Sequence, residues 1–348
     1  METAGIKRPV VLAIAGTIAA FLPQYFMRWN GSAYMFFYDT LHTYSGDLWN
    51  FFANYLAKGL HYPPEYPAGL RFAYEALGLY RIHDYTVFFT LNTIVLAVFA
   101  AGTTWLMFKI LANRSVGQGR PLDVSGLWYF WILAPSLLFY GAYNYDLAVV
   151  FLVVLAVFLY LEHKPYLAVA VLAVGTVVKV FPVFLLPAFI FMSPRRYWLP
   201  MATLFGSVAI ALNLPYALSD FHSWLYPYVW QISSNLTTSP AGNTYWWIIY
   251  PLAGRFTGWL SLGLFAILYV LALRVIASRK MSGREDAFLD LCLAAILLFL
   301  LTDRIYSPQY DLYLLPFLVL AYRKIDLRLF YAIEIPNLLL GLFLFFLR

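Results

Sequence analysis

Two acidic residues in the polar segment that follows the first long apolar run are the first candidates for chemistry. Asp39 or Asp47 could act as a general base that takes the proton from an attacking hydroxyl group, and we favour Asp47. Simpler roles stay open, because Asp47 is also placed to cap a helix and Asp39 to lie in solvent. The segment therefore predicts either a catalytic carboxylate or a capped helix.

A proline-rich aromatic turn, His61–Pro67, follows these acids. Its three prolines each fix a φ angle and stiffen the backbone around the polar residues. Aromatic rings stack on the C–H faces of sugars, while a carboxylate accepts hydrogen bonds from sugar hydroxyls, so the turn is suited to bind a saccharide. A structural turn that packs the loop onto the protein is an equal alternative. The candidate substrate-binding residues of this turn are His61, Tyr62, Glu65 and Tyr66.

Three further ionisable residues stand next to or within apolar surroundings. Lys179 and Arg304 are suited to hold a phosphate group, since Arg offers a bidentate fork and Lys a point charge. Asp146 could line the same cavity or hold a cation. In the alternative, Arg304 forms a buried ion pair with Asp303 or Asp311, and Lys179 extends its amine to the membrane surface.

The composition indicates an integral membrane protein. The 348 residues are 63% hydrophobic and 11% charged, whereas soluble domains have about 45–50% and about 25%. The apolar runs have lengths typical of membrane helices, and the short alternating pattern of the strands of a membrane barrel is not seen. The net charge of +6 is explained by basic cytoplasmic loops, so it does not indicate nucleic acid. No His/Cys cluster with metal-ligand spacing and no phosphate-binding or dinucleotide motif is found.

The chain is predicted to be one all-α membrane domain, residues 1–348, with about eleven membrane segments. Basic residues fall on one side if the runs alternate, which places the N-terminus in the cytoplasm. Two long loops, 28–85 and 217–255, then lie outside, and Asp47–Lys58 is expected to form an amphipathic helix at the membrane interface. The apolar runs are Pro9–Met27, Thr86–Leu111, Val124–Tyr143, Leu147–Leu161, Tyr166–Val178, Val180–Met192, Trp198–Tyr216, Phe256–Ile276, Ala287–Leu301, Leu312–Tyr322 and Leu329–Leu347.

Both legs of the hairpin Pro165–Met192 are short for a bilayer crossing, and so is the C-terminal leg of the hairpin Ala287–Tyr322. We predict that each is broken at its tip, at Lys179–Pro182 and at Thr302–Asp311. Broken backbone at membrane depth is tolerated where it is buried in protein or lines a wet cavity. The tips therefore predict that Lys179 and Arg304 share such a cavity.

Four sequence segments in order resemble the GT-C superfamily of glycosyltransferases, and among them the family 87 type of mannosyltransferase. The segments are Gly46–Leu48, Gly59–Pro67, Lys179–Pro182, and Tyr306–Tyr310 followed by Leu314–Pro316. The resemblance implies a GT-C-like helical fold and inverting transfer of a sugar, mannose being the usual one, from a polyprenyl-phosphate donor to a glycolipid or glycan acceptor at the outer face of the cell membrane.

The resemblance also implies roles for individual residues. Asp47 would be the base, Lys179 and Arg304 would neutralise the leaving phosphate, and Tyr306 and Gln309 would hold groups of the donor. The lipid bilayer is the remaining partner, and no cofactor is required. A divalent cation could still be held by Asp39, Asp47 and Asp146.

Two other functions are considered. Broken helices with charged tips also occur in transporters, so a flippase for a lipid-linked saccharide is one alternative. Two pseudo-symmetric halves are not detected, and a transporter has less use for a long acidic outer loop. The other alternative is a non-catalytic membrane subunit of a glycosylation complex.

Overall fold

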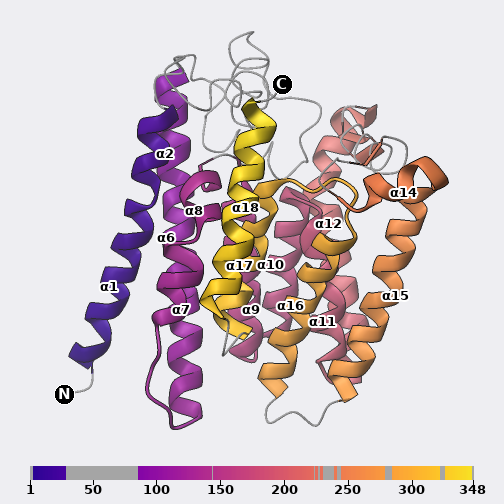
Figure 1. Cartoon of the computed structure of the whole chain (residues 1–348). Helices are drawn as coiled ribbons and strands as arrows, with labels where there is room; N and C mark the ends of the chain where they lie inside the picture. Colours follow the sequence, from indigo (N-terminus) through magenta and orange to yellow (C-terminus); the bar gives the residue numbers. More distant parts are fainter. Residues whose placement is uncertain are drawn as a thin grey trace.

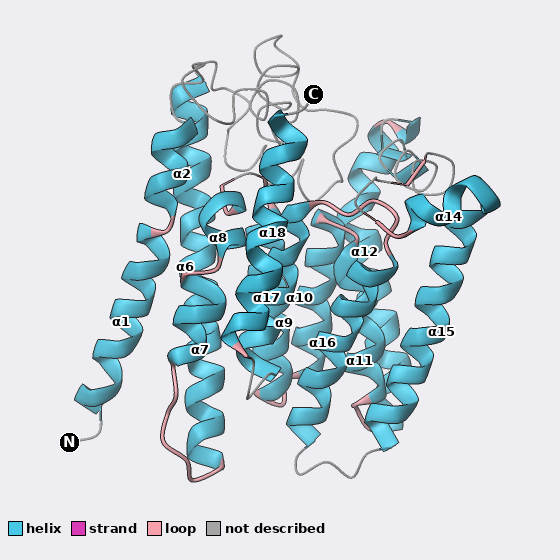
Figure 2. Cartoon of the chain, viewed as in Figure 1, coloured by secondary structure: helices cyan, strands magenta, loops and turns pink. Residues whose placement is uncertain are grey.

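The structure, a computed structural model, is all-helical, and no strand occurs in the part of the chain that it describes (Figure 2). That part comprises residues 3–28, 85–142, 144–222, 224–225, 228–229, 239–240, 244–278, 284–321 and 326–346. The main helices are α1 (Thr3–Ala19), α2 (Phe21–Arg28), α6 (Tyr85–Gly117), α9 (Asp146–Leu161), α10 (Pro165–Val178), α12 (Trp198–Ser219), α15 (Phe256–Ser278), α16 (Arg284–Thr302), α17 (Asp311–Ala321) and α18 (Leu327–Phe346). Shorter ones are α7 (Ser125–Leu127), α8 (Pro135–Tyr140), α11 (Leu186–Phe191) and α14 (Trp246–Ala253). The predicted amphipathic helix at Asp47–Lys58 lies outside the described residues.

The long helices stand side by side in one bundle (Figure 1). α9 packs against both α6 and α10, and α10 packs against α12. On the other side, α16 lies between α15 and α17, and α18 contacts α8. The start of α9 and the end of α10 therefore lie at one end of the bundle, and the turn between these two helices lies at the other.

Three helical segments are long and apolar enough to cross a membrane: Phe89–Gly117, Arg195–Ser219 and Phe256–Ile276. Large apolar side chains on the last two are exposed, among them Ile210 and Ile267. Apolar side chains on the outside of a helix bundle are expected where lipid is the solvent. The protein is therefore a helical membrane protein, and the number of crossings stays a prediction.

The run Val124–Tyr143, predicted as a single segment, is divided in the structure. It forms α7, one π-helical turn (Trp128–Ile132) and α8. The Leu133 N–H bonds to the Trp128 carbonyl, and Ala134 is extended directly before Pro135. A proline disfavours the helical conformation of the residue before it and lacks an N–H, so the helix stops here and restarts at Pro135.

Both predicted helix breaks are present. α10 ends at Val178, Lys179 is extended, and a 3-10 turn (Phe181–Leu185) containing Pro182 leads into α11. The second break lies between α16 and α17, where residues 303–307 are irregular and a 3-10 turn (Pro308–Tyr310) precedes Asp311. We call residues 303–310 the 303–310 loop.

Candidate active site

An ion pair at the end of the bundle links the two helices that meet there. The Lys179 ammonium lies 2.5 Å from the Asp146 carboxylate. Asp146 begins α9 and is fully buried, while Lys179 directly follows α10. The Asp146 N–H donates to the Asn144 side-chain oxygen at 3.0 Å, which ties the first residue of α9 to the turn before it. The positive end of the α9 dipole also favours a carboxylate at this position.

Aromatic residues from the second break complete this cluster. The Tyr313 hydroxyl donates to the same Asp146 oxygen that faces Lys179. The Lys179 ammonium lies 5.6 Å from the ring centroids of both Tyr310 and Tyr313, within the range of a cation–π contact. The ring of Phe181 stacks on Tyr313 at 3.8 Å between centroids. The break at Lys179 is therefore in contact with Tyr310, at the end of the 303–310 loop, and with Tyr313 in the first turn of α17.

One oxygen of Asp146 is available for a further partner. Oδ1 is used by Lys179 and Tyr313, whereas the buried Oδ2 accepts no hydrogen bond within the described part of the chain. Buried polar atoms are nearly always hydrogen-bonded in native proteins. Asp146 Oδ2 is thus suited to receive a hydrogen bond from a bound hydroxyl group.

Arg304 is buried in the 303–310 loop, with only 2% of its surface exposed. Its carbonyl accepts a hydrogen bond from Thr244 at 3.4 Å. The adjacent Asp303 accepts the Ile305 N–H at 3.1 Å. The structure thus places Arg304 inside the protein next to Asp303.

Tyr306 and Gln309 lie in the same loop and have internal partners. The Tyr306 hydroxyl lies 2.8 Å from Asp311 and 2.9 Å from the Asn337 side-chain oxygen. The Gln309 side chain accepts a hydrogen bond from Ser307. Asp311, which the sequence offered as a partner for Arg304, bonds Tyr306 and Asn337 instead.

The remaining predicted site residues lie outside the described residues: Asp39, Asp47, His61, Tyr62, Glu65 and Tyr66. Of the three aspartates predicted to hold a cation, only Asp146 is described. No group of three or more His, Cys, Asp or Glu side chains suited to a metal occurs among the residues that the structure describes. The roles of these six residues therefore stay predictions. So does the binding of a divalent cation by Asp39, Asp47 and Asp146.

Sequence reasoning missed the aromatic and acidic partners that α17 and α18 supply. Tyr310 and Tyr313 are three residues apart, the spacing at which side chains share one helix face, and this was the available signal. Glu334 is a lone acid in an apolar run, which marks a candidate functional residue in a membrane segment.

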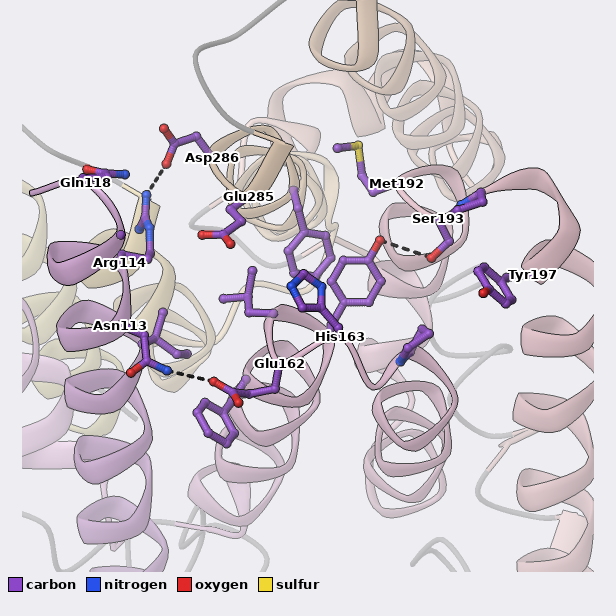
Figure 3. Close-up of a pocket in the computed structure, with 18 of the residues that line it drawn as sticks. Asn113, Arg114, Gln118, Glu162, His163, Met192, Ser193, Tyr197, Glu285 and Asp286 are labelled. Atoms are coloured by element: carbon purple, nitrogen blue, oxygen red, sulfur yellow. Dashed lines mark hydrogen bonds and ion pairs between the residues drawn. The ribbon is translucent and has the colours of Figure 1, made fainter.

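A pocket of about 750 Å³ lies at the opposite end of the bundle (Figure 3). It is lined by the last turns of α6 and α9 and by the first turn of α16. Asn113 donates to Glu162 at 2.8 Å, and Arg114 forms an ion pair with Asp286. Because the pocket lies at the α9–α10 turn, it is separate from the Asp146–Lys179 pair.

His163, at the rim of this pocket, adopts a left-handed backbone conformation with φ 59°. The Lys164 N–H bonds to Leu159 and the His163 N–H to Tyr160, which is the pattern of a Schellman helix end. α6 ends in the same pattern with Gly119 at the equivalent position, φ 61°. A left-handed conformation is unfavourable for residues that carry a Cβ atom.

We therefore expect His163→Gly to stabilise the protein by about 1 kcal/mol, because glycine adopts this conformation without a Cβ clash. Thermal unfolding in detergent would show a slightly higher Tm. Gly119→His is the reciprocal control and should lower the Tm by a similar amount. An unchanged or lower Tm for His163→Gly would mean that the imidazole makes a stabilising contact.

A helix bundle with apolar outer surfaces and a buried charged pair at a helix break is characteristic of an integral membrane protein that handles a polar substrate. The chain matches the model of glycosyltransferase family 87 over residues 61–302, well over half of its length. It therefore belongs to that family and is a membrane glycosyltransferase. No curated protein and no solved structure matches the chain. The matched range includes Asp146 and Lys179 and excludes Asp47 and Arg304.

Proposed function

We propose that the protein transfers a sugar, mannose in our hypothesis, from a polyprenyl-phosphate donor to a hydroxyl group of a glycolipid or glycan acceptor. The acceptor oxygen attacks the anomeric carbon and forms the new glycosidic bond. The bond between that carbon and the phosphate oxygen breaks, and the phosphate leaves with the electron pair. Attack from the face opposite the phosphate inverts the anomeric configuration.

Asp47 takes the acceptor proton in this proposal, with Asp39 as the competing candidate. Lys179 and Arg304 lie near the leaving phosphate, whose negative charge grows as the bond breaks, and a positive charge held in place stabilises that change. Asp146 has two functions: Oδ1 holds the Lys179 ammonium in position, and Oδ2 accepts a hydrogen bond from the sugar. His61, Tyr62, Glu65 and Tyr66 would contact the saccharide.

The observation that carries the proposal is the Asp146–Lys179 pair at the junction of two broken hairpins. Asp146 is fully buried, and the Lys179 side chain is 26% exposed. Taking a charge out of water to form an ion pair adds little stability compared with apolar packing, so stability alone is a weak reason for the presence of this pair. Lys179 also contacts Tyr310 at the end of the 303–310 loop, which carries Arg304, so both predicted phosphate ligands belong to connected elements.

The orientation is part of the proposal. The basic residues Arg114 and Arg196 line the pocket at the opposite end of the bundle from Asp146 and Lys179. Basic residues collect on the cytoplasmic side of membrane proteins, which supports a cytoplasmic position for the pocket and an extracytoplasmic one for the site.

The test is transfer by the purified protein in lipid nanodiscs. Radiolabelled mannose would be supplied as polyprenyl-phosphate mannose or as nucleotide-linked mannose, each with a set of glycolipid acceptors. We expect product only from the lipid-linked donor, with the anomeric configuration of the product opposite to that of the donor. Transfer from the nucleotide donor alone, or retention of configuration, would contradict the proposal.

A further inference from the structure

The pocket at the α9–α10 turn has no part in the proposed reaction, because it lies at the opposite end of the bundle from Asp146 and Lys179. Its volume of about 750 Å³ is within the range of small-molecule sites, which is about 300–1,000 Å³. Its walls are the last turns of α6 and α9, the first turn of α16 and the 3-10 turn Arg195–Tyr197 before α12 (Figure 3). The charges on these walls indicate which ligand the pocket fits.

Three carboxylates and two guanidinium groups line the pocket among the described residues. Arg114 and Asp286 form an ion pair and neutralise each other. The remaining charged groups are the carboxylates of Glu162 and Glu285 and the guanidinium of Arg196. None of these three forms an ion pair within the described part of the chain. The pocket therefore presents two negative charges and one positive charge to a ligand.

The negative and positive charges come from different walls of the pocket. Glu162 follows the end of α9 and Glu285 lies in the first turn of α16, whereas Arg196 precedes α12. In Figure 3, both glutamates lie on one side of His163, and Tyr197 lies on the other. Arg196 donates a hydrogen bond to the Tyr197 hydroxyl at 3.0 Å, and its guanidinium carbon lies 4.8 Å from the centroid of that ring. A neutral tyrosine does not compensate the charge, so Arg196 keeps the capacity to bind an anion.

The surface beside the Arg196 wall is apolar and exposed. Leu167, near the start of α10, is 56% exposed, and Leu199, near the start of α12, is 76% exposed. The ring of Tyr166 packs edge-on against Tyr197 at 5.7 Å between centroids and joins these two helix starts. Exposed apolar side chains and tyrosines at the end of a membrane bundle are typical of the boundary between lipid and water. A molecule with its polar end in the pocket can place apolar chains on this surface.

We propose that the pocket binds the headgroup of phosphatidylethanolamine, a phospholipid that carries a primary ammonium and a phosphodiester. The ammonium donates hydrogen bonds to Glu162 and Glu285, and the phosphodiester accepts them from Arg196. The acyl chains lie on the surface formed by Leu167 and Leu199. A choline headgroup has no N–H to donate, and a glycerol headgroup has no positive charge for the two carboxylates. The site is independent of the proposed sugar transfer.

The test is lipid binding by the purified full-length protein in detergent. Dioctanoyl phosphatidylethanolamine would be titrated while Tm is measured, because a ligand of the folded state raises Tm with its concentration. We expect a saturable rise, with a midpoint concentration about tenfold lower than for the dioctanoyl phosphatidylcholine or phosphatidylglycerol, since hydrogen bonds to charged groups are lost in both. A midpoint for either of these lipids equal to that of phosphatidylethanolamine, or lower, would overturn the proposal.

Variants of the pocket distinguish a specific site from a general effect of lipid. Glu162→Gln keeps an acceptor for Asn113, which donates to Glu162 at 2.8 Å, but removes the negative charge. Glu285→Gln makes the same change on α16, and Arg196→Gln removes the positive charge. Each variant is expected to raise the midpoint for phosphatidylethanolamine by about tenfold. Its Tm without lipid should stay near the wild-type value, since no ion pair is broken.

Asp123→Asn is the matched control. Asp123 is an exposed acid between α6 and α7 that does not line the pocket, and its Oδ1 accepts the Ser125 N–H at 2.9 Å. Asn retains that acceptor and loses only the charge, so the lipid midpoint should equal that of the wild type. The same midpoint in the wild type, the control and all three pocket variants would show that the lipid acts elsewhere and would contradict the proposal.

The source of the headgroup is tested with glycerophosphoethanolamine, which has the same ammonium and phosphodiester but no acyl chains. Burial of each methylene group favours binding, so the soluble compound is expected to bind much more weakly than the dioctanoyl lipid. Equal binding of the two would mean that the pocket takes a soluble ligand, which contradicts a lipid site beside Leu167 and Leu199. Native mass spectrometry should show one bound phosphatidylethanolamine per chain in the wild type and none in the Glu162→Gln, Glu285→Gln double variant.

Discussion

Sugar transfer is expected to fall by about two to four orders of magnitude when Asp47 is replaced with Asn. An amide has nearly the same shape as a carboxylate but cannot take the proton of the acceptor hydroxyl. The acceptor would then have to attack as a neutral alcohol, with water as the only base. The measurement is the initial rate of transfer from a polyprenyl-phosphate sugar at saturating donor and acceptor.

The Asp47→Asn variant is informative because it also tests whether Asp47 serves only as a helix N-cap. Asn and Asp are equally good helix N-caps, so Asp47→Asn preserves a capping role. Its Tm should equal that of the wild type if the protein folds normally. Asp39→Asn is the matched variant, and its transfer rate should stay close to the wild-type rate if Asp47 is the base. Full transfer by the Asp39→Asn, Asp47→Asn double variant would exclude a catalytic role for both acids.

The helix breaks were predictable because the signals are local. Pro182 and Pro308 lack the N–H that a continuous helix needs, and each follows a polar interruption of an apolar run. The same signal was present at Pro135 but was missed, since the run around it is uniformly apolar. Hydropathy therefore located the helical runs, but it did not show where a helix is interrupted when the residues on both sides of the break are apolar.

The pairing of Asp146 with Lys179 follows from geometry that the sequence contained. The α9–α10 turn is centred on His163, which lies 17 residues after Asp146 and 16 before Lys179. In an antiparallel hairpin with a tight turn, residues equidistant from the turn lie opposite each other. Asp146 and Lys179 were both predicted as possible lining residues of one cavity, but their equal spacing from the turn was not used to pair them.

The partner of Glu334 could not be obtained in this way. Ser136, whose hydroxyl donates to Glu334 at 2.8 Å, belongs to α8 and lies 198 residues earlier in the chain, so no short turn relates the two. Only the packing of α18 on α8 and on the 303–310 loop brings them together. An acidic residue in an apolar run can be recognised in the sequence as a candidate site. Its hydrogen-bond partner cannot, because tertiary contacts determine which residue lies beside it.

Replacing Lys179 with Met is expected to have the second large effect, on both stability and transfer. Asp146 would be left fully buried with Tyr313 as the hydrogen-bond donor to its side chain. Removing one partner of a buried ion pair typically destabilises a protein by about 3–5 kcal/mol. A lower Tm and a much reduced rate of transfer are expected, but the rate alone would not distinguish a role in catalysis from a loss of folded protein.

The Asp146→Asn, Lys179→Met double variant makes that distinction. It has no buried unpaired charge, so its Tm should recover most of the loss seen for Lys179→Met. Its transfer rate should remain low, because the donor phosphate still lacks the Lys179 cation and the charge that develops on it is not stabilised. Lys179→Arg keeps the charge and should retain part of the activity. Recovery of both Tm and transfer in the double variant would mean that Lys179 serves only to balance Asp146.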